Sequence, residues 1–269
     1  MTTRPRPIGD HLRDWRQRRR LSQLDLACDA GISTRHLSFV ETGRSRPSRE
    51  MVLHLAERLD VPLRERNTLL VAAGFAPAYP LRPLDDPALA PARRAVERVI
   101  EAQMPNPALA VDRHWHLVHA NAAVAALTAG VAPALLQPPV NVLRLGLHPE
   151  GLAPRTANLP EWRAHLLDRL RRQIAVSADP VLADLLAELE AYPLPASTVT
   201  ALAPAEDGHP DVAVPLRLVT ESGVLSFLST TTVFGTPVDV TLAELAVEAF
   251  FPADAATAEA LRHLGPSGL

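Results

Sequence analysis

The 269-residue chain contains no lysine and only one cysteine. Its 27 basic residues are therefore all arginines. A single cysteine excludes an internal disulfide, and the apolar residues spaced around Cys28 predict a small, buried side chain there. With 47% hydrophobic residues the chain can build sizeable cores, in one large domain or two ordinary ones.

Long apolar runs are absent too. No stretch reaches the roughly 20 apolar residues of a membrane-spanning helix. The polar first residues lack the apolar segment of a secretory signal peptide. We therefore expect a soluble, cytoplasmic protein with no membrane partner.

Catalytic signatures are missing as well: the chain has no GxSxG elbow, no phosphate-binding glycine loop and no HExxH motif. His114, His116 and His119 lie close together, and the first two would share one face of a strand, which hints at a metal. We interpret these histidines as having no cysteine or acidic residue at ligand spacing beside them. We therefore expect no metal site, no required cofactor and no enzymatic activity.

Charge is distributed unevenly along the chain. Residues 1–66 hold 14 arginines and 9 acidic residues, whereas residues 67–269 hold 13 arginines and 21 acidic residues. The overall net charge of −3 is thus the sum of a basic N-terminal part, residues 1–66, which we call the head, and an acidic remainder. This asymmetry is typical of a DNA-binding module fused to a second domain.

Apolar periodicity and cap residues predict five helices in residues 1–75. Ser22, Ser33 and Ser48 are expected to cap three of them, and Asp25 completes a capping box with Ser22. The proline-rich residues 76–91 predict a semi-stiff linker.

Residues 92–269 predict a second domain of the α+β class, with a small antiparallel sheet and flanking helices. The expected strands are residues 108–111, 115–118, 212–218 and 224–234. Expected helices include a stripe at residues 96–100, residues 121–128, segments beginning at residues 160 and 180, and residues 242–250. Residues 131–160 are broken by prolines and are expected to be irregular.

Residues 21–49 read as two short helices joined by a glycine turn and followed by an arginine-rich loop, the arrangement that places one helix in the major groove of DNA. The second helix should turn Ile32, Leu37 and Val40 inward. Its outward edge is then expected to read bases through Thr34, Arg35, Ser38 and Phe39. For Phe39, an inward orientation is an equal alternative.

Phosphate contacts are expected beside this edge, from Ser22, Gln23, Arg44, Arg46 and Arg49. Residues 18–20, all arginines, can add to them. The alternative for an arginine outside the turn is a solvated surface position, and the alternative for the whole segment is a helical bundle without DNA contacts.

Over residues 7–62 the chain resembles the Xre family of lambda-repressor-like helix-turn-helix regulators. The residues that carry this resemblance are Leu12, Arg16, Leu21, Ser22, Gln23, Leu26, Ala27, Gly31, Ile32, Ser33, Glu41, Gly43, Pro47 and Ser48. The resemblance implies an ion pair between Arg16 and Glu41 that ties two helices together. It also implies a homodimer on a palindromic double-stranded operator.

Three further segments, residues 35–50 with 64–79, residues 138–163 and residues 227–254, make the whole chain resemble the MmyB-like transcription regulators. That resemblance implies a PAS-like ligand-binding domain, in a family that includes members with a bound fatty acid. The chain is then expected to be a transcription regulator that senses a hydrophobic small molecule.

A lipid-like ligand needs a dry wall and a polar anchor. The wall candidates are Leu143, Leu145, Leu147, Trp162, Leu166, Phe227 and Phe234. The anchor candidates are Arg144, Arg155, His148 and Asn141. The alternative for the apolar residues is ordinary core, and the alternative for the arginines is a surface or structural ion pair.

Two other functions compete with this hypothesis. In the first, the second domain serves only dimerisation or protein contacts, and the regulator has no ligand. In the second, the chain is an enzyme with a DNA-binding head, which the missing nucleophile–base arrangement disfavours.

Overall fold

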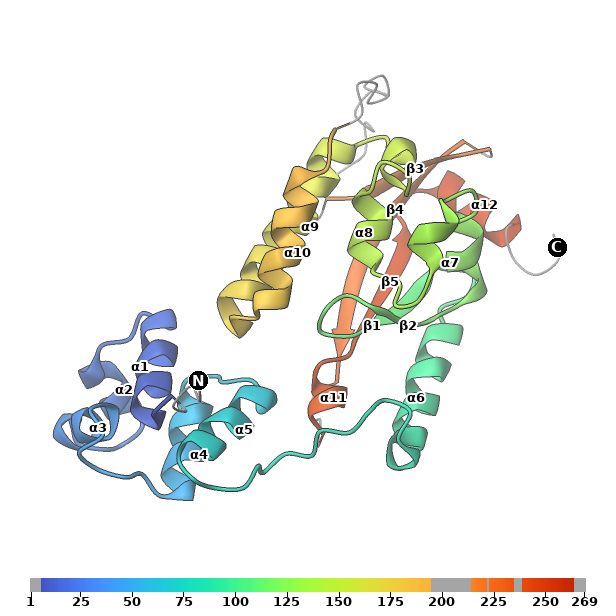
Figure 1. Ribbon diagram of the computed structural model, residues 1–269. Coiled ribbons are helices and arrows are strands. Elements are labelled where there is room, and N and C mark those ends of the chain that lie inside the picture. Colours follow the sequence, from blue (N-terminus) through green and yellow to red (C-terminus); the bar gives the residue numbers. More distant parts are fainter. Residues whose placement is uncertain (1–5, 195–213, 222, 235–238, 264–269) are drawn as a thin grey trace. The chain divides into compact units, whose positions relative to one another are not determined.

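The computed structural model describes residues 6–194, 214–221, 223–234 and 239–263, and these form two compact units (Figure 1). The first unit contains the helices of the basic head, the chain up to Pro83 and a short segment around residues 239–243. Most of the remaining described residues form the second unit. Within these ranges, no helix combines the length and apolar character needed to cross a membrane.

The N-terminal part of the first unit contains the five predicted helices, and three of them start at the predicted serine caps. They are α1 (Ile8–Arg18), α2 (Gln23–Asp29), α3 (Thr34–Glu41), α4 (Arg49–Arg58) and α5 (Leu63–Ala72). Ser22 and Asp25 form the expected capping box, and the hydroxyls of Ser33 and Ser48 accept backbone hydrogen bonds at the starts of α3 and α4. The core between the helices is mainly aliphatic and includes Trp15, with Leu12 and Leu37 completely buried.

The burial predicted for Cys28 is wrong, because its side chain is exposed. Helix α2 turns Leu26 and Ala27 into the core, and one position further along a helix is rotated by about 100° away from that face. Cys28 therefore faces outward beside the exposed Leu24.

The second unit is built on a five-stranded antiparallel sheet with the order β2-β1-β5-β4-β3. The strands are β1 (Ala108–Val111), β2 (Leu117–Ala120), β3 (Leu216–Thr220), β4 (Gly223–Val233) and β5 (Ala246–Pro252). The last strand in the sequence lies in the middle of the sheet, where Ala249 is opposite Ala108 on one side and Thr230 on the other. Pro215 precedes the edge strand β3, as expected for a residue that cannot donate to a ladder.

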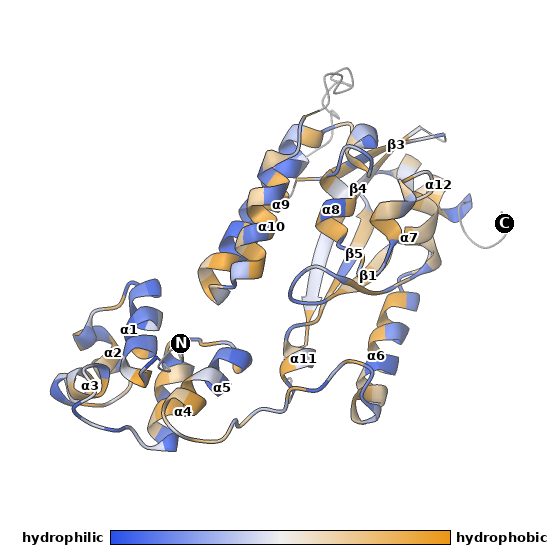
Figure 2. Ribbon diagram, viewed as in Figure 1, coloured by the Kyte–Doolittle hydropathy of each residue, from blue (hydrophilic) through white to orange (hydrophobic). Residues whose placement is uncertain are grey.

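Helices flank this sheet, which confirms the predicted fold class of an all-α head and an α+β second domain (Figure 1). They are α6 (Ala90–Glu101), α7 (Ala122–Leu127), α8 (Val142–Leu147), α9 (Leu159–Ser177), α10 (Pro180–Ala191) and α12 (Ala255–His263), while the short α11 (Val240–Ala243) belongs to the first unit. Figure 2 shows α6 with hydrophobic residues on one side and hydrophilic residues on the other, whereas the short α7 is hydrophobic throughout. The large apolar core of this unit includes Trp162, Leu170 and Phe227.

The helix predicted for residues 242–250 is wrong, because most of this segment is the central strand β5. Val247, Glu248 and Ala249 are consecutive and all buried, as occurs in a strand covered on both faces. Such a strand loses the alternating pattern, so periodicity alone does not distinguish it from a helix. Helix α12, directly after β5, is not among the helices that the sequence predicts.

Other boundaries also differ from the sequence predictions. Residues 131–160 are not entirely irregular, since α8 lies within them. Strand β2 starts at Leu117 and not at Trp115, because Trp115 has a φ of +67°, which bends the chain there. In the predicted linker, residues 90 and 91 already belong to α6. The predicted strand positions up to residue 213 lie outside the described residues.

Candidate DNA interface and ligand cavity

Helix α3 presents the edge that the sequence predicts for base reading. Leu37 and Val40 are completely buried under it. On the other side Arg35 is exposed, and Thr34 and Ser38 are partly exposed. Polar side chains that can donate or accept hydrogen bonds therefore line the accessible face of a two-turn helix.

The orientation of Phe39, which the sequence leaves open, is intermediate. Its ring is partly exposed and lies near two guanidinium groups. The central carbon of Arg35 is 5.3 Å from the ring centroid, and that of Arg44 is 5.9 Å away. Both cations are held near the surface of α3 by this contact with an aromatic ring.

A rim of exposed arginines follows α3, formed by Arg44, Arg46 and Arg49. In the described part of the chain, no carboxylate lies within ion-pair distance of Arg35 or of these three arginines. Their charges are thus available to an acidic partner. Arg19, by contrast, donates to the carbonyl oxygens of Leu59 (2.8 Å) and Asp60 (2.9 Å) and has a structural role.

The expected ion pair between Arg16 and Glu41 is present and links α1 to the buried side of α3. The Arg16 Nε and Nη2 atoms donate to the two Glu41 carboxylate oxygens at 2.7 and 2.9 Å. Burial alone would raise the pKa of Glu41, but the hydrogen bonds from Arg16 and Gln23 outweigh it and lower that pKa below its ordinary value. The carboxylate side chain is completely buried, so its charge depends on these donors.

Gln23 and Ser22, both expected at phosphates, have structural partners here. The Gln23 side-chain amide donates to Glu41 at 2.8 Å, and the Ser22 hydroxyl accepts the backbone N–H of Asp25. An amide has a second N–H to offer. Phosphate contacts by these two residues stay a prediction.

The second unit contains an apolar cavity of about 120 Å³ between the sheet and α7, α8 and α9. Its wall is almost entirely hydrophobic and includes Leu109, Leu143, Leu145, Trp162, Leu166 and Phe227. The charged lining residues are Arg169 from α9 and Glu248 from β5.

Arg169 and Glu248 form a two-pronged ion pair in the cavity wall. The Arg169 Nη1 and Nη2 atoms donate to Glu248 at 2.9 and 2.5 Å, and Nη2 also donates to the Thr231 hydroxyl at 2.8 Å. The guanidinium carbon lies 4.6 Å from the centroid of the Trp115 ring, which lines the cavity as well. The Glu248 side chain is only 5% exposed, so this pair is a fixed polar feature of a dry wall.

The structure brings only some of the predicted ligand residues to this cavity. Trp162 and Phe227 line it, whereas Phe234 follows β4 and is exposed. Asn141 instead caps α8 by accepting the backbone N–H groups of Leu143 and Arg144.

The predicted anchors Arg144, His148 and Arg155 do not line the cavity either. Arg144 forms a two-pronged pair with Glu188 at 2.8 and 2.7 Å. Arg155 donates to two backbone carbonyls, and the His148 ring packs edge-on against Tyr192. In this structure these three side chains therefore make structural contacts, which is the alternative to ligand binding that the sequence leaves open for the arginines.

Sequence reasoning missed Arg169 and Glu248. A helix at residues 242–250 would place Glu248 on its polar face, where an acidic residue is ordinary. In a buried apolar strand, by contrast, a lone acidic residue indicates a buried ion pair. Once β5 is recognised as a central strand, a buried Glu248 requires a cationic partner.

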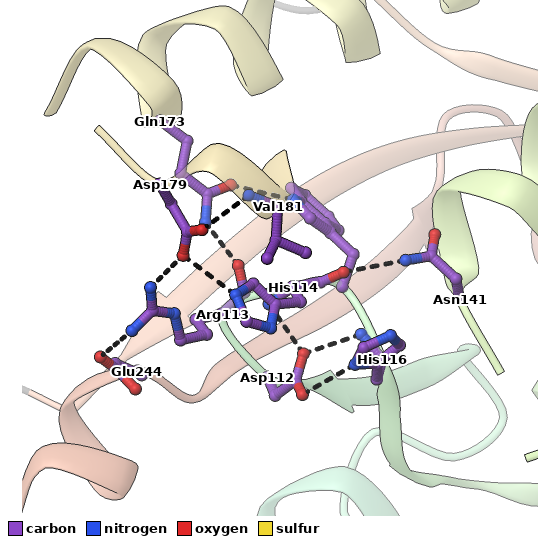
Figure 3. A network of polar contacts seen from close by, with 10 residues as sticks. Asp112, Arg113, His114, His116, Asn141, Gln173, Asp179, Val181 and Glu244 are labelled. Atoms are coloured by element: carbon purple, nitrogen blue, oxygen red, sulfur yellow. Dashed lines mark hydrogen bonds and ion pairs between the residues drawn. The ribbon is translucent and has the colours of Figure 1, made fainter. Parts of the chain in front are cut away.

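A second polar network lies at the turn between β1 and β2 (Figure 3). Arg113 in this turn forms ion pairs with Asp179, the N-cap residue of α10, and with Glu244. Asp179 also accepts a hydrogen bond from His114 at 2.9 Å. The turn is thereby joined to two later segments of the chain.

A helix-turn-helix head with an exposed arginine rim, joined to a cavity-bearing α+β domain, defines the class of DNA-binding regulators with a ligand-binding domain. Residues 7–69 match the family of helix-turn-helix domains, and residues 92–264 match the MmyB-like transcription regulator ligand binding domain. The chain belongs to the MmyB-like transcription regulators. Comparison with curated proteins gives no match.

Proposed function

We propose that this regulator binds a double-stranded operator as a homodimer in the cytoplasm and that a hydrophobic small molecule in the second domain controls the binding. The observation that carries the proposal is the polar edge of α3, bordered by arginines that have no carboxylate partner in the described residues. A fatty acid or a similar amphiphile is the expected effector, and no further cofactor is required.

For DNA, the geometry of α3 supports a division of labour. Arg35 lies at the accessible N-terminal end of α3, where a guanidinium can form two hydrogen bonds with a guanine. Thr34 and Ser38 supply shorter hydrogen-bonding groups on the same face. Arg44, Arg46 and Arg49 are placed after α3, where they would contact phosphates. Two copies would read half-sites about 34 Å apart, one DNA turn.

The experiment for this part is operator binding by the full chain over a salt series. We expect Arg35→Ala to weaken specific binding by about 1–3 kcal/mol, because it removes a base contact. Arg44→Ala should weaken binding to all sequences and reduce the slope of log K against log salt by about 1, because it removes a phosphate contact. Arg262→Ala on α12, a surface arginine paired with Glu259, is the matched control. Wild-type behaviour of both α3 variants would refute the assignment.

For the ligand, the nearly dry wall supports an apolar occupant. Each buried methylene contributes about 0.8 kcal/mol before ordering costs. A cavity of about 120 Å³ is somewhat smaller than the roughly 150 Å³ that admits benzene in an apolar core. The described conformation therefore suits a short apolar segment, and a long acyl chain would have to displace wall side chains.

Gly146 offers a way to test occupancy. It lines the cavity on α8, and an added Cβ there would meet no atom within 4 Å. We expect Gly146→Phe to abolish the thermal shift caused by acyl ligands, because the ring would fill the cavity, while Gly146→Ala should retain it. Native mass spectrometry of gently purified protein reports any ligand carried along. A protein that stays empty and shows no shift with any chain length would favour a second domain that serves only dimerisation or protein contacts.

A further inference from the structure

The turn between β1 and β2 gathers a carboxylate and two imidazoles. Asp112, His114 and His116 each offer one potential ligand atom, and these atoms all lie within 4.8 Å of one another (Figure 3). The sequence interpretation that no acidic residue lies at ligand spacing beside these histidines is therefore wrong, because Asp112 lies there. His119, the third histidine of that pattern, lies on β2 and faces Glu101 at 3.5 Å.

Backbone hydrogen bonds hold this cluster together. One Asp112 carboxylate oxygen accepts the N–H groups of both His114 and His116 at 2.8 Å. The other carboxylate oxygen lies 3.1 Å from His116 Nδ1. The two histidines are thus held next to the same carboxylate before any ligand arrives, which lowers the entropic cost of binding one.

A further carboxylate orients His114 from outside the cluster. His114 Nε2 lies 2.9 Å from an Asp179 carboxylate oxygen, and the His114 carbonyl accepts a hydrogen bond from Asn141 at 2.8 Å. A carboxylate on the far nitrogen of an imidazole is the usual support of a metal-binding histidine, because it fixes the ring and leaves the other nitrogen as the donor.

Charge and access also favour a cation. The neighbouring Arg113 is directed to Asp179 and Glu244, and Figure 3 shows it extending away from Asp112. In the described ranges Asp112 has no arginine partner. The side chains of Asp112, His114 and His116 are 37%, 26% and 29% exposed, so an ion and a water ligand can reach them.

We propose that Asp112, His114 and His116 bind a divalent transition metal ion of the zinc type, with water completing the coordination. Two imidazoles and one carboxylate suit zinc, cobalt or nickel and not magnesium or calcium, which prefer oxygen ligands. Metal–ligand bonds of about 2.0–2.2 Å place tetrahedral donors roughly 3.3 Å apart. Small side-chain rotations within the 4.8 Å cluster achieve this.

The test is titration of untagged, chelator-treated full-length protein with cobalt(II), followed by its visible absorption, and with zinc(II) as competitor in calorimetry. We expect one ion per chain. Asp112→Asn removes the charge but keeps an oxygen that can accept the two backbone N–H groups of the turn. This variant and His116→Gln should each weaken cobalt(II) binding at least tenfold. Circular dichroism of both variants checks that the fold is retained.

His119→Gln and the exposed His263→Gln are the matched controls, because they remove a histidine outside the cluster. Both should bind cobalt(II) like the wild type. The proposal is overturned if the wild type binds no stoichiometric ion at micromolar concentrations. It is also overturned if Asp112→Asn and His116→Gln bind as tightly as the wild type, or if His119→Gln weakens binding equally.

Discussion

At the residue scale, a buried charge determines how α3, the helix proposed to read DNA, is held in place. Glu41 ends α3 and is completely buried, and it receives hydrogen bonds from Arg16 and Gln23. Removing one partner of such a pair leaves an uncompensated charge and costs about 3–5 kcal/mol. The position of the exposed polar edge of α3 thus depends on the ion pair between Arg16 and Glu41 on the buried side of the helix.

This pair predicts a specific dependence of stability on pH. The pKa of Glu41 is lower in the folded than in the unfolded chain, where it lies near 4.5. The stabilisation is therefore complete above 4.5 and is lost as the pH falls through the folded pKa. We expect Glu41→Gln to lower the free energy of unfolding of the head at neutral pH, and the difference from the wild type to shrink as the pH falls below 4.5. Denaturant unfolding at several pH values measures it, and a difference that stays constant with pH would contradict this role.

At the scale of elements, the packing of α1 on α3 requires a residue without a side chain. A Cβ added to Gly9 would lie 2.4 Å from the carbonyl oxygen of Glu41 and 2.7 Å from that of Val40. Both are backbone atoms, so neither can rotate away. Helix α3, which carries the edge proposed to read bases, therefore packs directly against α1.

Two matched glycine substitutions test this packing. Gly9→Ala should destabilise the chain by about 1–3 kcal/mol through overpacking and should also weaken operator binding, because α3 must move. Gly146→Ala on α8, where the added Cβ meets nothing within 4 Å, should be neutral or stabilise by up to about 1 kcal/mol. Thermal unfolding compares them, and equal effects of the two substitutions would show that the close contact does not limit stability.

At the scale of the whole molecule, control of DNA binding by a ligand requires a coupling free energy between two sites. An effector that binds both forms of the regulator equally well shifts nothing. If an acyl ligand changes operator affinity by some factor, the operator must change ligand affinity by the same factor.

This reciprocity is measurable with the purified full chain. We expect calorimetric ligand affinities with and without operator DNA to differ by about 5–150-fold, the usual range of such coupling. Gly146→Phe should still bind DNA but should lose its response to the ligand. If ligand binding leaves the operator affinity unchanged, the cavity does not control DNA binding.

The sequence by itself determined the head of this protein. Cap residues such as Ser22 and Ser33, and the glycine turn after α2, act on backbone groups a few residues away, so their effect can be read locally. The ion pair between Arg16 and Glu41 followed from the family resemblance. For the same local reason the cap at Asp179 and the period of α10 were predictable.

Only the tertiary structure decided the chemistry of the second domain. Arg169 and Glu248 are 79 residues apart, and they meet because β5 inserts into the middle of the sheet. Long-range pairing also directs Arg144 to Glu188 and away from the cavity. Burial of a charged side chain depends on which segments cover it, and that coverage is not encoded in the period of its own neighbours.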